Sequence, residues 1–168
     1  AAAPVLASYF REQEIEDLVV VSPDLGGVTR ARIMADFLRA PIAIIEKRRP
    51  CPGCAEVMNL IGDVEGRTAL LIDDIVDTAG SLCEGAKALK DRGAKRVLAA
   101  CSHAILSDPA VERLNASVID QLVITDSIPI SPEKQSDKFV TLSLAQSLAD
   151  VIVRIQSHRS VSLLFNHH

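Results

Sequence analysis

The stretch Ala69-Leu70-Leu71-Ile72-Asp73-Asp74-Ile75-Val76-Asp77-Thr78-Ala79-Gly80-Ser81 decides the fold class of this 168-residue chain. An apolar run ends at two adjacent carboxylates, and a turn of small residues then opens a predicted helix. A strand that is apolar at every position is typical of the middle of a parallel sheet with helices on both faces. Ligands of such sheets bind beyond the carboxyl ends of the strands. The polar residues from Asp73 onward are therefore predicted to lie at a binding edge.

The same alternation of short apolar runs and amphipathic helices extends outward in both directions. The predicted strands are Leu18–Ser22, Ile42–Ile45, Ala69–Asp73, Arg96–Cys101 and Ile119–Ile124. The predicted helices are Val28–Leu38, Thr78–Arg92, a helix N-capped by Asp108 that runs through Leu114 with Pro109 in its first turn, and Leu142–Ser157. The alternation predicts an α/β fold, a doubly wound and mostly parallel sheet of about five strands flanked by helices. We expect a single domain over residues 1–168.

Composition narrows the class of protein. The net charge of −4 argues against a nucleic-acid partner, which favours a broad basic face. No apolar run reaches the roughly 20 residues of a membrane span, and no secretory signal opens the chain, so neither a membrane partner nor export is expected. The four cysteines are expected to be free thiols in a reducing cytoplasm. The absence of an initial Met suggests that upstream sequence was removed, and His167-His168 suggests a purification tag.

The turn after the acidic pair has the chemistry of a phosphate site. Residues 78–81 place unpaired backbone N–H groups and two hydroxyls at a helix N-terminus, which suits a phosphate monoester. Gly80 lets the backbone approach the ligand closely. Asp73 and Asp74 can accept hydrogen bonds from ribose hydroxyls, directly or through a bridging Mg²⁺. In the alternative interpretation, Asp77-Thr78 only cap the helix and the two acids only end a strand.

These residues resemble the phosphoribosyl diphosphate signature of type I phosphoribosyltransferase folds. The chain as a whole resembles one branch of that group, the ribose-phosphate diphosphokinases. The matching stretches are Val19–Asp24, Gly26–Arg32, Ala40–Pro50, Ala55–Asn59, the loop after Asp73, and Ser160–Phe165.

The resemblance implies a role for each motif. Asp77, Thr78, Ala79, Gly80 and Ser81 would hold the 5-phosphate, and Asp73 and Asp74 the ribose hydroxyls. The loop of Asp24, Gly26, Gly27, Thr29 and Arg30 would receive the diphosphate. Mg²⁺ would be held by Asp24, Asp73 and Asp74, and Lys47 and Arg49 would be catalytic. From the residues alone, the glycine pair fits a simple turn equally well, and the basic run at Lys47 fits a solvated turn.

The implied reaction transfers diphosphate from ATP, the co-substrate, to the 1-hydroxyl of ribose 5-phosphate, and AMP leaves. Family members have two similar domains, of which this chain resembles only the C-terminal one. We therefore expect it to bind ribose 5-phosphate but to be inactive or weakly active alone. The family implies a homo-oligomer, a hexamer regulated by phosphate and ADP. The apolar end Val161–Phe165 is expected to pack on a neighbour or in its own core.

Two other functions stay open at this stage. The first is a phosphoribosyltransferase that consumes phosphoribosyl diphosphate, although no segment for a nucleobase hood is evident. The second is a non-catalytic subunit associated with a synthetase.

Several residues depart from the pattern. Leu25 replaces a His that many relatives carry. Cys51 and Cys54 are expected to be incidental thiols, with a regulatory disulfide as the alternative. Cys83 and Cys101 are expected in the core or a helix. His103 is expected near the site or in a structural hydrogen bond, and His158 on a surface helix.

Overall fold

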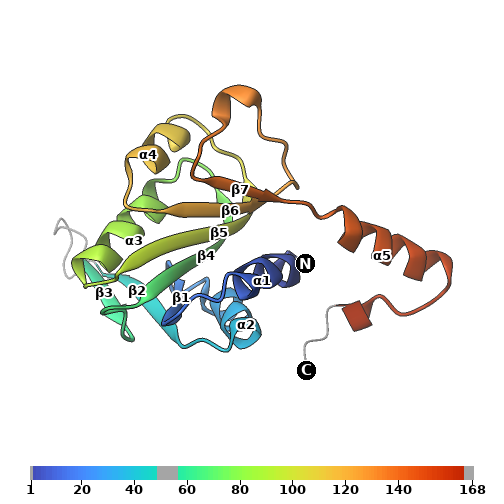
Figure 1. The fold of residues 1–168 in the computed structure, drawn as a ribbon, viewed down its shortest axis with the longest axis horizontal. Helices are drawn as coiled ribbons and strands as arrows, with labels where there is room; N and C mark the ends of the chain where they lie inside the picture. The colour runs from blue at the N-terminus through green and yellow to red at the C-terminus, as the bar shows by residue number, and fades with distance from the viewer. Residues whose placement is uncertain (1, 49–56, 165–168) are drawn as a thin grey trace.

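A computed structural model describes residues 2–48 and 57–164 of the chain (Figure 1). The helices are α1 (Ala3–Glu12), α2 (Val28–Leu38), α3 (Gly80–Asp91), α4 (Ala110–Ala116) and α5 (Ala145–Gln156), with 3₁₀ turns at Pro132–Lys134 and Ser162–Leu164. The strands are β1 (Leu18–Ser22), β2 (Ile42–Arg48), β3 (Val57–Ile61), β4 (Thr68–Val76), β5 (Arg96–Ala104), β6 (Gln121–Thr125) and β7 (Phe139–Leu142).

The strands form one sheet in the order β3-β2-β1-β4-β5-β6-β7. All neighbouring strands pair in parallel except β2 and β3, which are antiparallel. The predicted mostly parallel α/β sheet is therefore confirmed, but the expected count of about five strands is too low. The two missed strands, β3 and β7, lie at the edges, where one interior neighbour is lacking. Asn59 interrupts the apolar pattern of β3, and β7 has only four residues, so neither carries the signal of a buried strand.

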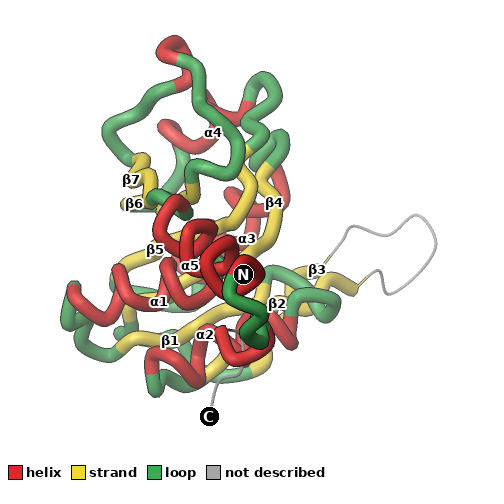
Figure 2. Tube along the Cα trace, turned by 90° about the vertical axis from the view of Figure 1, so that its right-hand side faces the viewer, coloured by secondary structure: helices red, strands yellow, loops and turns green. Residues whose placement is uncertain are grey.

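Helices cover both faces of the sheet, as the apolar strands predict. Leu71 of β4 packs with Leu82 of α3 and Leu114 of α4 in one core cluster. Leu70, its neighbour in the strand, packs with Phe10 of α1 and Met34 of α2 in the other. Figure 1 shows the two helix pairs on opposite sides of the strands, and Figure 2 shows α1 beside α2 at right angles to that view.

Element boundaries differ from the prediction in informative places. The predicted Val28–Leu38 helix and Leu18–Ser22 strand are confirmed, whereas α1 was not predicted. Ala79 adopts a left-handed conformation with φ 59°, which is not helical, so α3 begins at Gly80 instead of Thr78. Helix α4 begins only at Ala110, with Pro109 at its N-cap and no side-chain capping bond, so the predicted cap by Asp108 is wrong.

Strands β4 and β5 are longer than expected. Asp73 and Asp74 lie within β4 rather than at its end, because β4 stays paired with β5 as far as Val76 and Ala104. The last β4 residue paired to β1 is Leu71, however, so the acidic pair extends past that neighbour. The strand predicted at Ile119–Ile124 lies at Gln121–Thr125.

Helix α5 stands apart from the sheet (Figure 1). None of its residues is buried, and Leu148 and Ile152 are among its exposed apolar side chains. Leu142, predicted to begin this helix, belongs to β7, and His158 lies in an exposed turn past the helix end. Within the described residues, no helix combines the length and apolar character that crossing a membrane requires.

Candidate functional site: a phosphate loop beside an acidic pair

The first and fourth strands bring two predicted loops together. Because β1 and β4 are parallel neighbours, the chain leaves both strands at the same edge of the sheet. A hollow of about 250 Å³ lies at this edge. It is lined by Asp24, Asp73, Ile75, Val76, Asp77, Thr78, Ala79, Gly80, Ser81 and Leu82. Residues predicted from separate motifs thus share one cavity, whereas Gly26, Gly27, Thr29 and Arg30 lie outside its lining.

The loop before α3 leaves its backbone donors free. Helix α3 has no side-chain capping bond and no acidic residue in its first turn. Among the described residues, the amide N–H groups of residues 78–82 donate no hydrogen bond to protein atoms. Asp77 and Thr78 therefore do not cap the helix, which removes that alternative interpretation. Free N–H groups at a helix N-terminus, with the positive end of the helix dipole, attract an anion.

The acidic pair is bridged by an arginine. Arg30 Nη2 lies 2.6 Å from Asp74 Oδ2, and Arg30 Nη1 lies 3.3 Å from Asp73 Oδ1. Asp73 Oδ1 also accepts a 2.8 Å hydrogen bond from the Asp74 amide. The Asp73 side chain is 29% exposed and that of Asp74 is 53% exposed. The guanidinium thus contacts both carboxylates at once.

Burial separates the acidities of these two neighbours. Burial raises the pKa of Asp73 to about 6, against the lowering effect of its bond from the Asp74 amide. Burial also opposes ionisation of the more exposed Asp74, but a hydrogen bond with Asp73 and the charge of Arg30 hold its pKa below the ordinary value. Asp73 is therefore a weaker acid than an ordinary aspartate, and its neighbour Asp74 is a stronger one.

The glycine loop after β1 is closed by its own aspartate. Asp24 Oδ1 accepts a 2.7 Å hydrogen bond from the Gly27 amide, and Ser22 Oγ donates to the Asp24 carbonyl at 2.6 Å. A Cβ on Gly27 would lie 2.9 Å from Ser22 Oγ, so the serine side chain or the loop would have to shift to admit one. Leu25, the departure from the family pattern, is 59% exposed on this loop.

Of the two predicted catalytic residues, Lys47 and Arg49, only Lys47 lies within the described residues. Lys47 lies near the end of β2, where its Nζ is 3.7 Å from Glu84 Oε2 of α3. Arg49 lies outside the described residues, as do Cys51 and Cys54. Lys47 is not among the residues that line the hollow. This lysine therefore contacts a carboxylate of α3, the helix that follows the loop of residues 77–79.

The donor atoms at this edge suit a hard cation. Carboxylate oxygens are the ligands that Mg²⁺ prefers, and Asp73 and Asp74 are adjacent. Within the described residues, however, no three His, Cys, Asp or Glu side chains converge as a metal cluster. Arg30 contacts one oxygen of each of the two carboxylates that would hold such an ion. A cation at these oxygens would therefore compete with the guanidinium.

Two contacts at the site could not be predicted from the sequence, because they are made by residues on helix surfaces. Glu84 Oε2 lies 3.7 Å from Lys47 Nζ, and Arg113 Nη1 donates to the Thr78 carbonyl at 3.1 Å. His103, expected at the site or in a structural bond, has the structural bond, with its Nδ1 2.9 Å from Ser127 Oγ, and it does not line the hollow. Cys101 is buried in β5 and Cys83 half-buried in α3, as expected.

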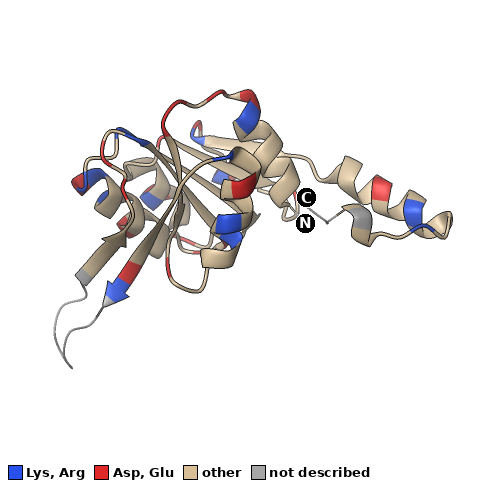
Figure 3. Ribbon diagram, turned by 90° about the horizontal axis from the view of Figure 1, so that it is seen from below, with Lys and Arg blue, Asp and Glu red and all other residues tan. Residues whose placement is uncertain are grey.

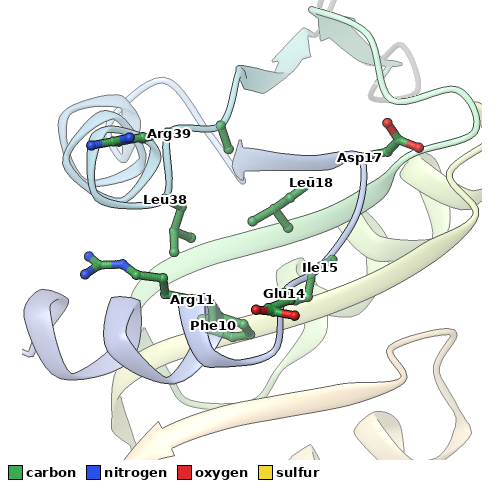
Figure 4. Close-up of a pocket in the computed structure, with 9 residues that line it drawn as sticks. Phe10, Arg11, Glu14, Ile15, Asp17, Leu18, Leu38 and Arg39 are labelled. Carbon is green, nitrogen blue, oxygen red and sulfur yellow. The ribbon is translucent and has the colours of Figure 1, made fainter.

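A second hollow lies at the other end of the sheet (Figure 4). It has about 310 Å³ and lies among α1, the end of α2 and the start of β1 at Leu18. Phe10 and Leu38 supply apolar lining, and Arg11 and Arg39 stand at its side. Because β1 starts here and ends at the glycine loop, this hollow is remote from the acidic pair. Elsewhere on the chain, basic and acidic residues are interspersed over several elements (Figure 3).

The sheet order and its flanking helices define an α/β protein with a phosphoribosyltransferase-like fold. Its fold matches that of a purine phosphoribosyltransferase from Pyrococcus horikoshii, with a TM-score of 0.51 at 21% identity over 83% of this chain and 78% of the other. More particularly, the chain belongs to the phosphoribosyl synthetase-associated domain family, whose profile matches residues 50–166.

Relatives within that family are close. Ribose-phosphate pyrophosphokinases of Oceanobacillus iheyensis and Bacillus subtilis are 56% and 55% identical over 97% of this chain. The phosphoribosylpyrophosphate synthetase of Mycobacterium smegmatis superposes with a TM-score of 0.86 at 36% identity over 94% of this chain. The chain spans about half the length of these relatives, 51% of each. The resemblance inferred from the motifs is thereby confirmed.

Proposed function

We propose that this chain is the ribose 5-phosphate and diphosphate half of a ribose-phosphate diphosphokinase. That enzyme would transfer diphosphate from ATP to the 1-hydroxyl of ribose 5-phosphate, giving phosphoribosyl diphosphate and AMP. The observation that carries the proposal is the uncapped start of α3, whose free amides border a hollow that Asp73 also lines. Free amides can bind the phosphate of the ligand, and the Asp73 carboxylate can bind the hydroxyls of its ribose. Membership of the synthetase family supports the same assignment.

Each motif then takes one task. The amides of residues 78–81 and the hydroxyls of Thr78 and Ser81 hold the 5-phosphate. Asp73 and Asp74 accept hydrogen bonds from the ribose hydroxyls. The Asp24 loop, with Gly26, Gly27, Thr29 and Arg30, receives the diphosphate. Asp24, Asp73 and Asp74 are the carboxylates that would hold Mg²⁺. Bound Mg²⁺ would neutralise charge on the phosphoryl oxygens.

The basic residues act on the transferred group. During transfer, negative charge accumulates on the phosphoryl and bridging oxygens. Lys47 and Arg49 are proposed to stabilise that charge, which requires Lys47 to leave Glu84, 3.7 Å away in the ligand-free protein. A lysine that a single exposed carboxylate holds at this distance is released at little cost. The two carboxylates on Arg30 hold that residue more firmly.

The remaining half of the enzyme would complete the ATP site. The relatives are about twice as long as this chain. Because its motifs resemble those of the second domain of the family, we propose that it corresponds to their C-terminal half, one domain over residues 1–168. It would bind ribose 5-phosphate alone but turn over weakly or not at all without the other half. The full-length protein is proposed to assemble as a homo-oligomer.

Calorimetric titration with ribose 5-phosphate, with and without Mg²⁺, tests the proposal. The variant Asp77→Asn/Gly80→Val should lose at least tenfold in affinity. A Cβ at Gly80 meets nothing closer than 3.5 Å, so the fold tolerates the change while the added methyl groups cover the free amides. Asp91→Asn, at the far end of α3, is the matched control and should bind as the wild type does. Equal binding by all three proteins would refute the phosphate loop.

A second assay separates the competing functions. Addition of phosphoribosyl diphosphate and a nucleobase should release no diphosphate, because a diphosphokinase makes that substrate and does not consume it. Release of diphosphate would favour a phosphoribosyltransferase. A folded chain that binds no ribose 5-phosphate, yet co-purifies with an active synthetase, would instead favour a non-catalytic subunit.

A further inference from the structure

The backbone of the phosphate loop has an unusual conformation at Ala79. This residue has φ 59°, in the left-handed region that side chains with a Cβ rarely adopt. It is also buried and has no side-chain polar group that could stabilise the turn. An asparagine or glycine at this position would adopt the conformation readily, but alanine does not. Something outside the residue must therefore hold the loop in place.

The contact that does so comes from α4. Arg113 reaches across from that helix, and its Nη1 donates a 3.1 Å hydrogen bond to the Thr78 carbonyl. The same nitrogen lies 3.5 Å from the point where a Cβ on Gly80 would stand. The guanidinium thus lies against the loop backbone on both sides of Ala79. No other side chain among the described residues bonds to the backbone of residues 77–80.

The contact at the Thr78 carbonyl also sets the direction of the Ala79 N–H, because both groups belong to one rigid peptide unit. In a planar trans peptide, the carbonyl of Thr78 and the N–H of Ala79 point in opposite directions. Arg113 holds the carbonyl but is not among the residues that line the hollow, whereas Ala79 is. Holding the carbonyl outward therefore turns the Ala79 N–H inward. If this peptide flipped, a carbonyl oxygen would face the anion instead of a donor.

We propose that Arg113 is a positioning residue of the phosphate loop, which keeps Ala79 left-handed so that its amide faces the 5-phosphate of the sugar. This inference rests on the proposed function for the identity of the anion, but not for the conformational effect on Ala79. The arginine acts through the peptide and does not touch the ligand.

A double-mutant cycle tests the inference: wild type, Arg113→Met, Ala79→Gly and the combination. Methionine keeps the length of the side chain but removes its donors. Arg113→Met should weaken ribose 5-phosphate binding about tenfold, as measured by calorimetry. Adding Ala79→Gly should restore most of that loss, because glycine adopts a positive φ without a steric penalty. Arg113→Lys, which keeps one charged donor, should lose less than Arg113→Met.

The ligand-free protein gives an independent readout. A combined set of three-bond couplings across φ of Ala79, measured on labelled protein, reports this angle, because one coupling alone fits several values of φ. This Ala79 coupling set should match the left-handed conformation in the wild type and move to averaged values in Arg113→Met. The matched control is Arg92→Met, because Arg92 Nη2 makes the same kind of bond to the Met58 carbonyl, at 3.0 Å, away from the loop. That control should leave both the coupling set and the affinity unchanged.

The outcomes are distinct. An unchanged Ala79 coupling set in Arg113→Met overturns the inference. A loss of affinity that Ala79→Gly fails to restore also overturns it, since Arg113 would then act by charge or by direct contact. A wild-type protein that does not bind ribose 5-phosphate refutes the proposed function, while the coupling set still decides the role of Arg113.

Discussion

Replacing Asp73 by asparagine is expected to stabilise the protein at neutral pH in the absence of ligand, while removing a carboxylate that is proposed to bind ribose. The reason is the raised pKa of this half-buried carboxyl, about 6 against an ordinary value of 3.8. The folded protein prefers the protonated acid, so ionisation of Asp73 destabilises the fold. This penalty is absent below pH 3.8, grows as the pH rises toward 6, and is complete above that value. Asparagine has the same shape and never ionises.

The two pKa values give the size of the effect. At about 1.36 kcal/mol per pKa unit, the penalty is roughly 3 kcal/mol at pH 7.5 and roughly 1 kcal/mol at pH 4.5. The value of about 6 already includes the favourable charge of Arg30, so no separate loss of that ion pair is subtracted. The expected stabilisation is therefore about 3 kcal/mol at pH 7.5 and about 1 kcal/mol at pH 4.5.

Urea denaturation at these two pH values measures the difference, with Asp77→Asn as the control. Asp77 is an exposed carboxylate of the same loop, so its replacement changes the local charge equally without removing a half-buried acid. Calorimetry on the same samples should show that Asp73→Asn binds ribose 5-phosphate more weakly than the wild type. Destabilisation by Asp73→Asn at pH 7.5, or an equal stabilisation at both pH values, would refute the reasoning.

Three further variants test other parts of the structure. Arg30→Gln removes the cation that lies 2.6 Å from Asp74, so calorimetry should show that Mg²⁺ binds about tenfold more tightly. Unchanged or weaker Mg²⁺ binding would contradict the bridging of Asp73 and Asp74 by Arg30. Leu71→Ala in the buried core should lower the free energy of unfolding by about 2 to 5 kcal/mol in urea, and a loss below about 1 kcal/mol would deny that packing. The double change Leu148→Lys/Ile152→Lys should alter stability by no more than about 0.5 kcal/mol, because nothing in α5 is buried, and a larger loss would mean that these side chains are covered.

Much of the fold was predictable because central strands carry a local signal. A strand buried on both faces is apolar along its buried length, and this pattern correctly predicted the positions of β1, β4 and β5. The signal fails at the sheet edges, where β3 and β7 lie, since an edge strand needs no continuous apolar run. It also fails at the start of α3, because the left-handed conformation of Ala79 depends on a contact from outside the loop.

The family, the α/β alternation and the loops of the candidate site could be inferred without a structure, because a short run of neighbouring residues carries the signal for each of them. How these loops are joined depends on contacts between distant residues. Arg30 bridges the acidic pair from 43 residues away, and Arg113 holds the phosphate loop from 35 residues away. No local pattern encodes such contacts, since the chain creates them only when strand order brings distant surface residues together.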